Sequence, residues 1–223
     1  MRSCMRSEGR IASQYRIAVM GPAAVGKSAI VHQFLYGKFQ PDYKKTVEDM
    51  HSKEFDLDGT KITLELLDTA GAYTFPSMRR LAIATSHAFV LVYSQDDKDS
   101  FREVTELRDV IIAQRETEEV PIVIVANKAD CETTNNRCER LETVETECAI
   151  ANVDWNNGFV SASAKKGNNV VAIFAEVLRL LSQEKTDVSE ALMKRWLSLS
   201  DLHNKDRKRS LNPKRSSFFR RTK

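Results

Sequence analysis

The sequence predicts an α/β fold in which a mostly parallel sheet carries helices on both faces. After residue 15, apolar runs of strand length alternate with amphipathic runs of helix length. The runs 88–93 and 121–126 are apolar throughout, as strands buried on both faces should be. Because strand–helix–strand units connect neighbouring strands through crossovers, most strands of such a sheet run parallel.

The elements follow from these patterns in chain order. The strand candidates are 15–20, 51–57, 61–67, 88–93, 121–126 and 158–161, which makes six. Asp58-Gly59 is a hairpin signal between the second and third strands, so we expect one antiparallel edge strand. The helix candidates are 27–35, 74–84, 100–115, 140–151 and 168–182. In the last of these, apolar residues recur at helical spacing and are expected in the core: Val170, Ile173, Phe174, Val177, Leu178 and Leu181.

Length and composition suggest one domain with extensions. A chain of 223 residues suits a single core with appendages. It has no apolar run of the roughly 20 residues that a membrane helix needs, and Met1–Arg10 lacks the apolar centre of a secretory signal. The four cysteines show no C-x-x-C spacing, which favours reduced thiols in the cytosol over a bridge or metal site at Cys131 and Cys138.

Charge is distributed unevenly along the chain. Residues 205–223 carry nine Lys or Arg and one Asp, whereas residues 17–183 sum to −7. This asymmetry indicates that the basic tail, rather than the domain, meets an anionic partner. We therefore expect a basic and disordered extension at 1–14, a globular domain at 15–183, and a partly disordered extension with a polybasic tail at 184–223.

A phosphate-binding loop follows the first strand candidate. Gly21-Pro-Ala-Ala-Val-Gly-Lys-Ser28 fits the pattern G-x-x-x-x-G-K-[ST] and precedes a helix candidate, which is the context that the motif needs. Backbone N–H groups at such a helix start surround phosphate oxygens, Lys27 adds a positive charge, and the Ser28 hydroxyl can ligate Mg²⁺. The predicted phosphate contacts are Ala23, Ala24, Val25, Gly26, Lys27, Ser28 and Ala29.

Three further motifs stand at the ends of later strand candidates. Asp68-Thr-Ala-Gly71 follows the third strand; Asp68 is placed to hold Mg²⁺ through water, and Gly71 lets its N–H approach the terminal phosphate without a Cβ. In Asn127-Lys-Ala-Asp130, the carboxylate can accept two N–H bonds from a guanine edge, a donor pair that adenine lacks. In Ser161–Lys165, a backbone N–H can bond the guanine carbonyl, and Lys165 can cover the base.

With these four motifs in this order, residues 15–183 resemble the Ras family of small GTP-binding proteins, which have a P-loop NTPase G domain. The resemblance implies that GTP or GDP binds with Mg²⁺ and that Ser28, Thr46 and, through water, Asp68 hold the metal. It also implies that Lys27, Thr46 and Gly71 serve catalysis and that Thr46 and Gly71 contact phosphate. The guanine contacts that it implies are Phe39, Asn127, Lys128, Asp130, Ser163, Ala164 and Lys165.

The same resemblance implies partners at the switch loops. The effector segment would be Lys44, Lys45, Thr46, Val47, Glu48 and Asp49, in which Lys45 stands where the Ras pattern has Pro. Residues 75–80 are similar to the second switch of the Rhes/Dexras-like and Ras-dva-like branch. Effector proteins, an exchange factor and a GTPase activator are then the expected protein partners, and no nucleic acid is expected.

Two further departures from the Ras pattern concern hydrolysis. Ala72 replaces the glutamine that orients the attacking water, and Ala23 replaces a glycine beside the γ-phosphate. We therefore expect a GTPase with slow intrinsic hydrolysis, unless Tyr73 or a partner's side chain positions the water. The alternative is an interaction module that holds GTP almost permanently. An ATP-using P-loop enzyme is a third interpretation, against which Asp130 argues.

The basic tail is compatible with several functions. No cysteine follows Cys148 and no glycine follows Met1, so we expect neither prenylation nor myristoylation, although Cys4 is a candidate for palmitoylation. Basic residues with Phe218 and Phe219 suit the anionic inner face of the plasma membrane. A nuclear localisation signal, a calmodulin-binding helix that includes Trp196, and a plain solvated tail remain alternatives.

Overall fold

In a computed structural model, a six-stranded sheet with the order β2-β3-β1-β4-β5-β6 forms the centre of the domain. The structure describes residues 13–41, 46–57, 60–71, 76–131 and 137–183. The strands are β1 (Ser13–Met20), β2 (Glu48–Leu57), β3 (Thr60–Thr69), β4 (Ala88–Ser94), β5 (Ile122–Asn127) and β6 (Gly158–Ser161). The helices are α1 (Lys27–Tyr36), α2 (Pro76–Thr85), α3 (Lys98–Arg115), α4 (Arg137–Ala149), the π-helix η1 (Ile150–Asp154) and α5 (Val170–Gln183).

Strand directions confirm the predicted architecture. β1 pairs in parallel with β3 and β4, β4 with β5, and β5 with β6, whereas β2 pairs antiparallel with β3 at the edge of the sheet. β2 begins at Glu48, earlier than the predicted 51, because Glu48 and Asp49 pair with Thr69 and Asp68 of β3. This polar start carries no alternating apolar pattern, so only the pairing with β3 defines it. The predicted turn at 58–59 lies outside the described residues.

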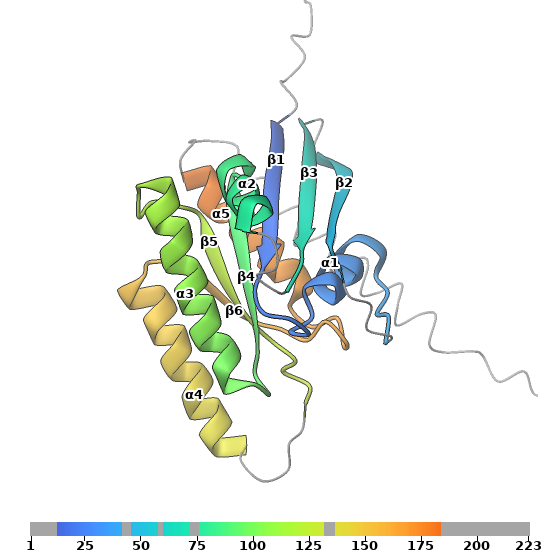
Figure 1. Cartoon of the computed structure of the whole chain (residues 1–223). Helices are drawn as coiled ribbons and strands as arrows, with labels where there is room; N and C mark the ends of the chain where they lie inside the picture. The colour runs from blue at the N-terminus through green and yellow to red at the C-terminus, as the bar shows by residue number, and fades with distance from the viewer. Residues whose placement is uncertain (1–12, 42–45, 58–59, 72–75, 132–136, 184–223) are drawn as a thin grey trace, which may run out of the picture.

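Each face of the sheet has its own core. On one face, α1 and α5 meet through Phe34 and Phe174, whose stacked rings have centroids 3.9 Å apart. On the other face, buried side chains of α2, α3 and η1 cover the opposite sides of the same strands. Figure 1 shows α2 and α3 in front of the sheet and α5 behind it. Helices on both faces explain why β4 and β5 are buried at every position.

The segment after α4 differs from a simple helix end. The predicted helix at 140–151 is observed as α4 followed by η1, in which the Trp155 N–H donates to the Ile150 carbonyl. Trp155 stacks on Phe101 of α3, with centroids 6.1 Å apart, and the Arg108 guanidinium lies 4.9 Å from the Trp155 ring centroid. These contacts pack the end of this helical segment against α3, on the face opposite α5.

The parallel strands bring their carboxyl ends to one edge of the sheet. β1 leads into the phosphate-binding loop, β3 into Asp68–Gly71, β5 into Asn127–Asp130 and β6 into Ser161–Lys165. In open α/β sheets, ligands bind at this edge. No helix among the described residues has the length and apolar character needed to cross a bilayer.

Candidate nucleotide-binding site

The phosphate-binding loop is fixed by its own lysine. The Lys27 ammonium donates to the carbonyl of Gly21 at 3.0 Å and to that of Pro22 at 2.6 Å. Only 6% of the Lys27 surface is exposed. Burial lowers the pKa of Lys27 to about 8, while the negative charges of Asp68 and Glu103 act in the opposite direction. A buried cation of this kind is stabilised by an anionic ligand such as phosphate.

Gly26 allows the loop to pass close to the base side of the site. Its φ is +100°, and a Cβ there would lie 2.4 Å from the Asn127 amide nitrogen. The same amide nitrogen donates to the carbonyl of Val25 at 2.8 Å. The end of β5 is therefore hydrogen-bonded directly to the phosphate-binding loop, and only glycine fits between them without strain.

Ser28, Thr46 and Asp68 form a cluster of oxygen atoms next to Lys27. The hydroxyl oxygens of Ser28 and Thr46 lie 2.9 Å apart. Asp68 is 2% exposed, and its Oδ1 has no hydrogen-bond partner. Burial raises the pKa of Asp68, while the Ser28 hydrogen bond and the Lys27 charge oppose that change. A buried carboxylate oxygen without a partner and two hydroxyls are hard ligands that suit Mg²⁺.

The composition of this cluster also argues for a cation shared with phosphate. Among the described residues, no group of three or more His, Cys, Asp and Glu side chains is arranged to hold a metal by itself. Mg²⁺ is often bound by one or two carboxylates together with substrate phosphates, rather than by a cage of protein ligands. Residues Ser28, Thr46 and Asp68 therefore fit a magnesium–phosphate complex.

Gly71 brings the end of β3 against the phosphate-binding loop. A Cβ on Gly71 would lie 2.4 Å from Ala23 Cα and 2.6 Å from Ala23 N, which no real side chain tolerates. The absence of a side chain at 71 thus allows the two backbones to touch. Ala23 itself is exposed beside this contact, so its methyl group lies at the surface of the loop.

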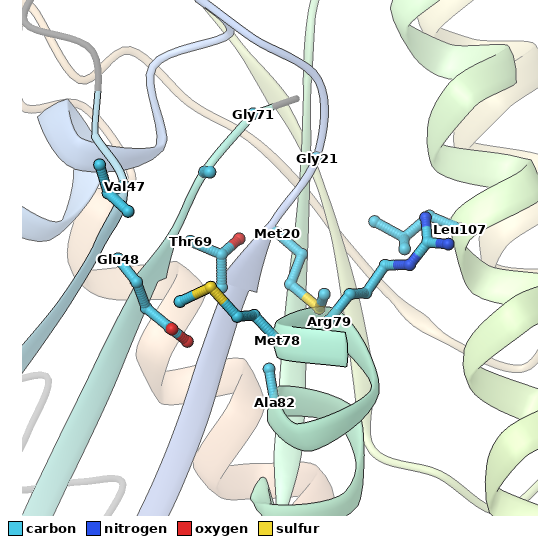
Figure 2. A pocket seen from close by; sticks show the side chains of 11 residues that line it. Met20, Gly21, Val47, Glu48, Thr69, Gly71, Met78, Arg79, Ala82 and Leu107 are labelled. Atoms are coloured by element: carbon cyan, nitrogen blue, oxygen red, sulfur yellow. The ribbon is translucent and has the colours of Figure 1, made fainter. Parts of the chain in front are cut away.

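A pocket joins the two segments expected to be switches. It is lined by Val47 and Glu48 of the expected effector segment, by the end of β3 and by α2, and it reaches the end of β1. Figure 2 shows Met78 extending from α2 toward the side of the pocket where Thr69 and Glu48 lie. Any movement of α2 or of the start of β2 would therefore change the shape of this pocket.

The base side is held by hydrogen bonds between three motifs. Asn127, 2% exposed, accepts from the backbone N–H of Ala164 at 3.1 Å through its Oδ1. The hydroxyl of Ser163 donates to the Asp130 carboxylate and accepts from the N–H of Lys166 at 3.0 Å. The structure thus brings Asn127, Asp130, Ser163 and Ala164 together, although more than 30 residues separate the two strand ends.

The remaining predicted base contacts are at least partly exposed. Phe39 is 36% exposed and Lys165 is exposed, while Lys128 is partly buried and has a φ of +62°. In the expected effector segment, Thr46 is partly buried, Val47 is 63% exposed, and Glu48 and Asp49 form the start of β2. Lys44, Lys45, Ala72 and Tyr73, to which effector and catalytic roles were assigned, lie outside the described residues.

Comparison with known proteins agrees with this arrangement. The sequence profile of the Ras family matches residues 16–183. The chain belongs to the Ras family. The human GTP-binding protein Rhes is 38% identical over 188 residues, which cover 81% of this chain and 69% of that protein. Rhes from Mus musculus and Rattus norvegicus are each 37% identical over the same shares.

Membership of the Ras family confirms the predicted family and its relation to Rhes. Ras-family proteins are small GTPases that bind guanine nucleotides, generally with Mg²⁺, and generally hydrolyse GTP. They act with effectors and regulators. In this Ras-family chain, the oxygen cluster around Asp68 and the Asp130 carboxylate lie where the carboxyl ends of β3 and β5 meet one edge of the sheet.

Two polar residues at this edge were not predicted from the sequence. The Gln95 amide donates to the Ala126 carbonyl and to the Ser161 hydroxyl, both at 2.9 Å, and so ties β5 to β6. Asp96 approaches the Lys128 ammonium at 3.3 Å. No motif marks Gln95 or Asp96, because their partners stand about 30 or more residues away and only the fold brings them together.

Proposed function

We propose that this Ras-family chain is a molecular switch in signal transduction that alternates between GTP and GDP and hydrolyses GTP slowly. The observation that carries the proposal is the meeting, at one edge of the sheet, of a buried lysine, the Ser28–Thr46–Asp68 oxygen cluster and the hydrogen-bonded Asn127–Asp130 motif. Few ligands other than a magnesium-bound guanosine phosphate offer groups that suit all three.

In this proposal, phosphate lies against the loop backbone. The N–H groups from Ala23 to Ala29 surround its oxygens, because the loop precedes the N-terminus of α1. Lys27 neutralises phosphate charge from a buried position that its two carbonyl contacts define. When bound, Mg²⁺ would neutralise further phosphate charge, held by Ser28, Thr46 and, through water, Asp68.

The base is read at the opposite end of the same edge. The Asp130 carboxylate accepts two N–H groups of guanine, and the N–H of Ala164 donates to the guanine carbonyl. Ser163 supports this role because its hydroxyl donates to Asp130 and limits the rotation of the carboxylate. Phe39, Lys128 and Lys165 cover the faces of the ring.

Switching follows from groups that gain contacts only with the third phosphate. Thr46 gains a metal ligand position, and the Gly71 N–H gains an acceptor, when GTP replaces GDP. Both residues border segments that line the pocket of Figure 2 or contact the phosphate-binding loop. Effectors would read the resulting conformation at Lys44–Asp49, and an exchange factor and a GTPase activator would set its lifetime.

Slow turnover follows from Ala72. In hydrolysis, water attacks the γ-phosphorus, the bond to the bridging oxygen of GDP breaks, and phosphate and a proton are released. A methyl at position 72 cannot orient that water as a glutamine amide does. We expect Ala72→Gln to hydrolyse GTP about tenfold or more faster than wild type, which corresponds to about 1.4 kcal/mol or more of barrier.

Single-turnover hydrolysis, after loading with GTP, measures this difference. Ala72→Ser is the matched control, since it adds a polar group that is too short to replace the amide. Equal rates for wild type and Ala72→Gln would mean that Tyr73 or another group already positions the water. Analysis of the nucleotide released from purified protein tests the wider proposal: neither GDP nor GTP, from folded protein in magnesium buffer, would refute it.

The alternative function is an interaction module that is bound to GTP almost permanently. The Ala72 and Ala23 replacements favour it, because both oppose hydrolysis. GTP retained through purification, with no turnover after addition of cell extract, would support this module. Turnover stimulated by the extract would support the cycling switch.

We further propose that residues 205–223 attach the protein to the inner face of the plasma membrane. Each basic residue near an anionic leaflet contributes about 1 kcal/mol, reduced by salt. A fluorescent fusion lacking residues 205–223 should lose membrane localisation, whereas deletion of 1–12 should not. Loss of nuclear rather than membrane signal would indicate a localisation sequence, and calcium-dependent capture would indicate calmodulin. An unchanged distribution would reject targeting by the tail.

A further inference from the structure

The turn between β4 and α3 is held rigidly beside the base side of the site. The N–H of Gln95 donates to the Asn127 carbonyl at 3.0 Å, and that of Asp97 to the Ser94 carbonyl at 3.0 Å. The fully buried hydroxyl of Ser100 accepts from the Ser94 N–H at 3.0 Å. The backbone around position 96 is therefore fixed by both β5 and α3.

The side chain of Asp96 extends from this turn to Lys128, the lysine proposed above to cover the base. One carboxylate oxygen accepts a hydrogen bond from the Ser94 hydroxyl, and both oxygens lie 3.3 Å from the Lys128 ammonium. Burial acts to raise the pKa of Asp96, but the Ser94 hydrogen bond and Lys128 outweigh it, so the pKa lies below its ordinary value. Asp96 is thus an anion whose position is set from two sides.

Lys128 combines an unusual backbone conformation with a long side chain. Its φ is +62°, a backbone conformation that residues other than glycine adopt rarely. A lysine side chain is long and flexible, and it loses rotamer freedom when it is held against a ring. A carboxylate that holds the ammonium in advance reduces the loss on nucleotide binding.

We propose that Asp96 is a positioning residue that holds Lys128 over the guanine ring and thereby slows nucleotide release. The inference rests on the proposed function, since it requires a bound guanine nucleotide, and it adds a residue outside the four motifs. The pair contributes little to folding, because about a third of each side chain (32%) is exposed to water. Its effect is on the lifetime of the complex.

Release of N-methylanthraniloyl-GDP from the full chain, in excess unlabelled GDP, tests the proposal. Asp96→Asn removes the charge and keeps the shape, and it should release nucleotide about three- to fivefold faster, the range of a partly exposed ion pair. Lys128→Met should also release faster. Because Asp96 acts through Lys128, the double variant should release no faster than Lys128→Met. Effects that multiply would overturn the proposal.

A matched control separates this effect from net charge. Asp99→Asn removes the same charge from an exposed residue in the first turn of α3 and should leave the release rate unchanged. GDP and IDP should respond equally to Asp96→Asn, because Lys128 covers the ring face and does not read its exocyclic amine. An accelerated release for Asp99→Asn, or for only one of the two nucleotides, would contradict the proposal.

Further variants identify the cause of any change. Asp96→Glu keeps the charge and should return the release rate toward that of wild type. If Asp96 had a purely structural role, both Asp96→Asn and Asp96→Glu would release nucleotide faster than wild type. If wild type does not bind the fluorescent nucleotide, the proposed function fails. If wild type binds it and Asp96→Asn releases it at the wild-type rate, only the role of Asp96 fails.

Discussion

At the base end of the site, Asn127 and Ser163 are buried and hydrogen-bonded to neighbouring motifs, whereas at the phosphate end Asp68 has a buried oxygen without a partner. At the base end, the side chains of Asn127 and Ser163 find their hydrogen-bond partners within the protein. The phosphate end also includes Val47, which is 63% exposed and immediately precedes β2. A site built in this way can keep its guanine specificity while the phosphate end responds to the ligand.

The physical reason lies in how each end is connected. Asn127 bonds to the phosphate-binding loop and to the segment after β6, so its position is determined by three strands. Thr46 and Gly71 each adjoin a segment outside the described residues, and among the described residues the Thr46 hydroxyl is hydrogen-bonded to that of Ser28. We expect a change at Asn127 to alter affinity and folding together, and a change at Asp68 to alter the ligand response without loss of stability.

The largest effect is expected at Asp130. Asp130→Asn should weaken GDP binding by about 10²–10⁴-fold, because two hydrogen bonds to a charged group contribute about 1.5–3 kcal/mol each. Xanthosine diphosphate, which carries a carbonyl where guanine has its amine, should bind the variant better than GDP does. Competition binding with the two nucleotides measures both changes. Unaltered GDP affinity would show that the base does not lie at Asp130.

A second prediction concerns the fold as well as the ligand. Asn127→Ala leaves the Val25 carbonyl and the Ala164 N–H without their hydrogen-bond partners. Each buried polar group left unpaired in this way costs about 1–3 kcal/mol of folding free energy. We expect the free energy of unfolding to fall by about 2–4 kcal/mol and nucleotide affinity to fall with it. Chemical denaturation and nucleotide titration measure the two quantities.

Asn157→Ala is the matched control for Asn127→Ala. Asn157 is also buried, at 5% exposure, and accepts from Arg108 Nε at 3.0 Å, but it lies between η1 and the amino end of β6, away from the carboxyl ends of the strands. Its loss should lower stability and leave nucleotide affinity unchanged. Equal losses of affinity in both variants would mean that the base end is not built differently from the rest of the domain.

The sequence predicted those parts of the molecule that short-range patterns specify. The strands β4 and β5 follow from apolar runs, and the phosphate-binding loop follows from its glycines and its context. The start of β2 was not predicted, because Glu48 and Asp49 are polar and their strand conformation depends on pairing with β3. The π-helix was not predicted either, since its sequence continues the helical pattern of α4.

At the site, the residue types could be predicted from the sequence, but the contacts between distant segments could not. The proximity of Ser28 and Thr46 was implied only by resemblance, since 18 residues separate them. The Asp96–Lys128 pair was not predicted at all, because an acidic residue in a turn is ordinarily solvated. Contacts of this kind depend on the order of strands in the sheet, which no local pattern determines.

The smallest expected effect on folding, and the sharpest contrast with Asn127, is at Asp68. Asp68→Asn keeps the shape of a side chain whose charge is opposed by burial. Chemical denaturation in EDTA should therefore show a free energy of unfolding equal to or above that of wild type. With Mg²⁺, GTP affinity should fall about tenfold or more, because a charged ligand of the metal is lost.

Asp49→Asn is the control for this prediction. Asp49 pairs with Asp68 across the β2–β3 ladder but is exposed, so its substitution should change neither the free energy of unfolding nor the GTP affinity. A variant of Asp68 that unfolds more easily, with unaltered dependence on Mg²⁺, would show that the carboxylate serves the fold, and the contrast between the two ends of the site would not hold.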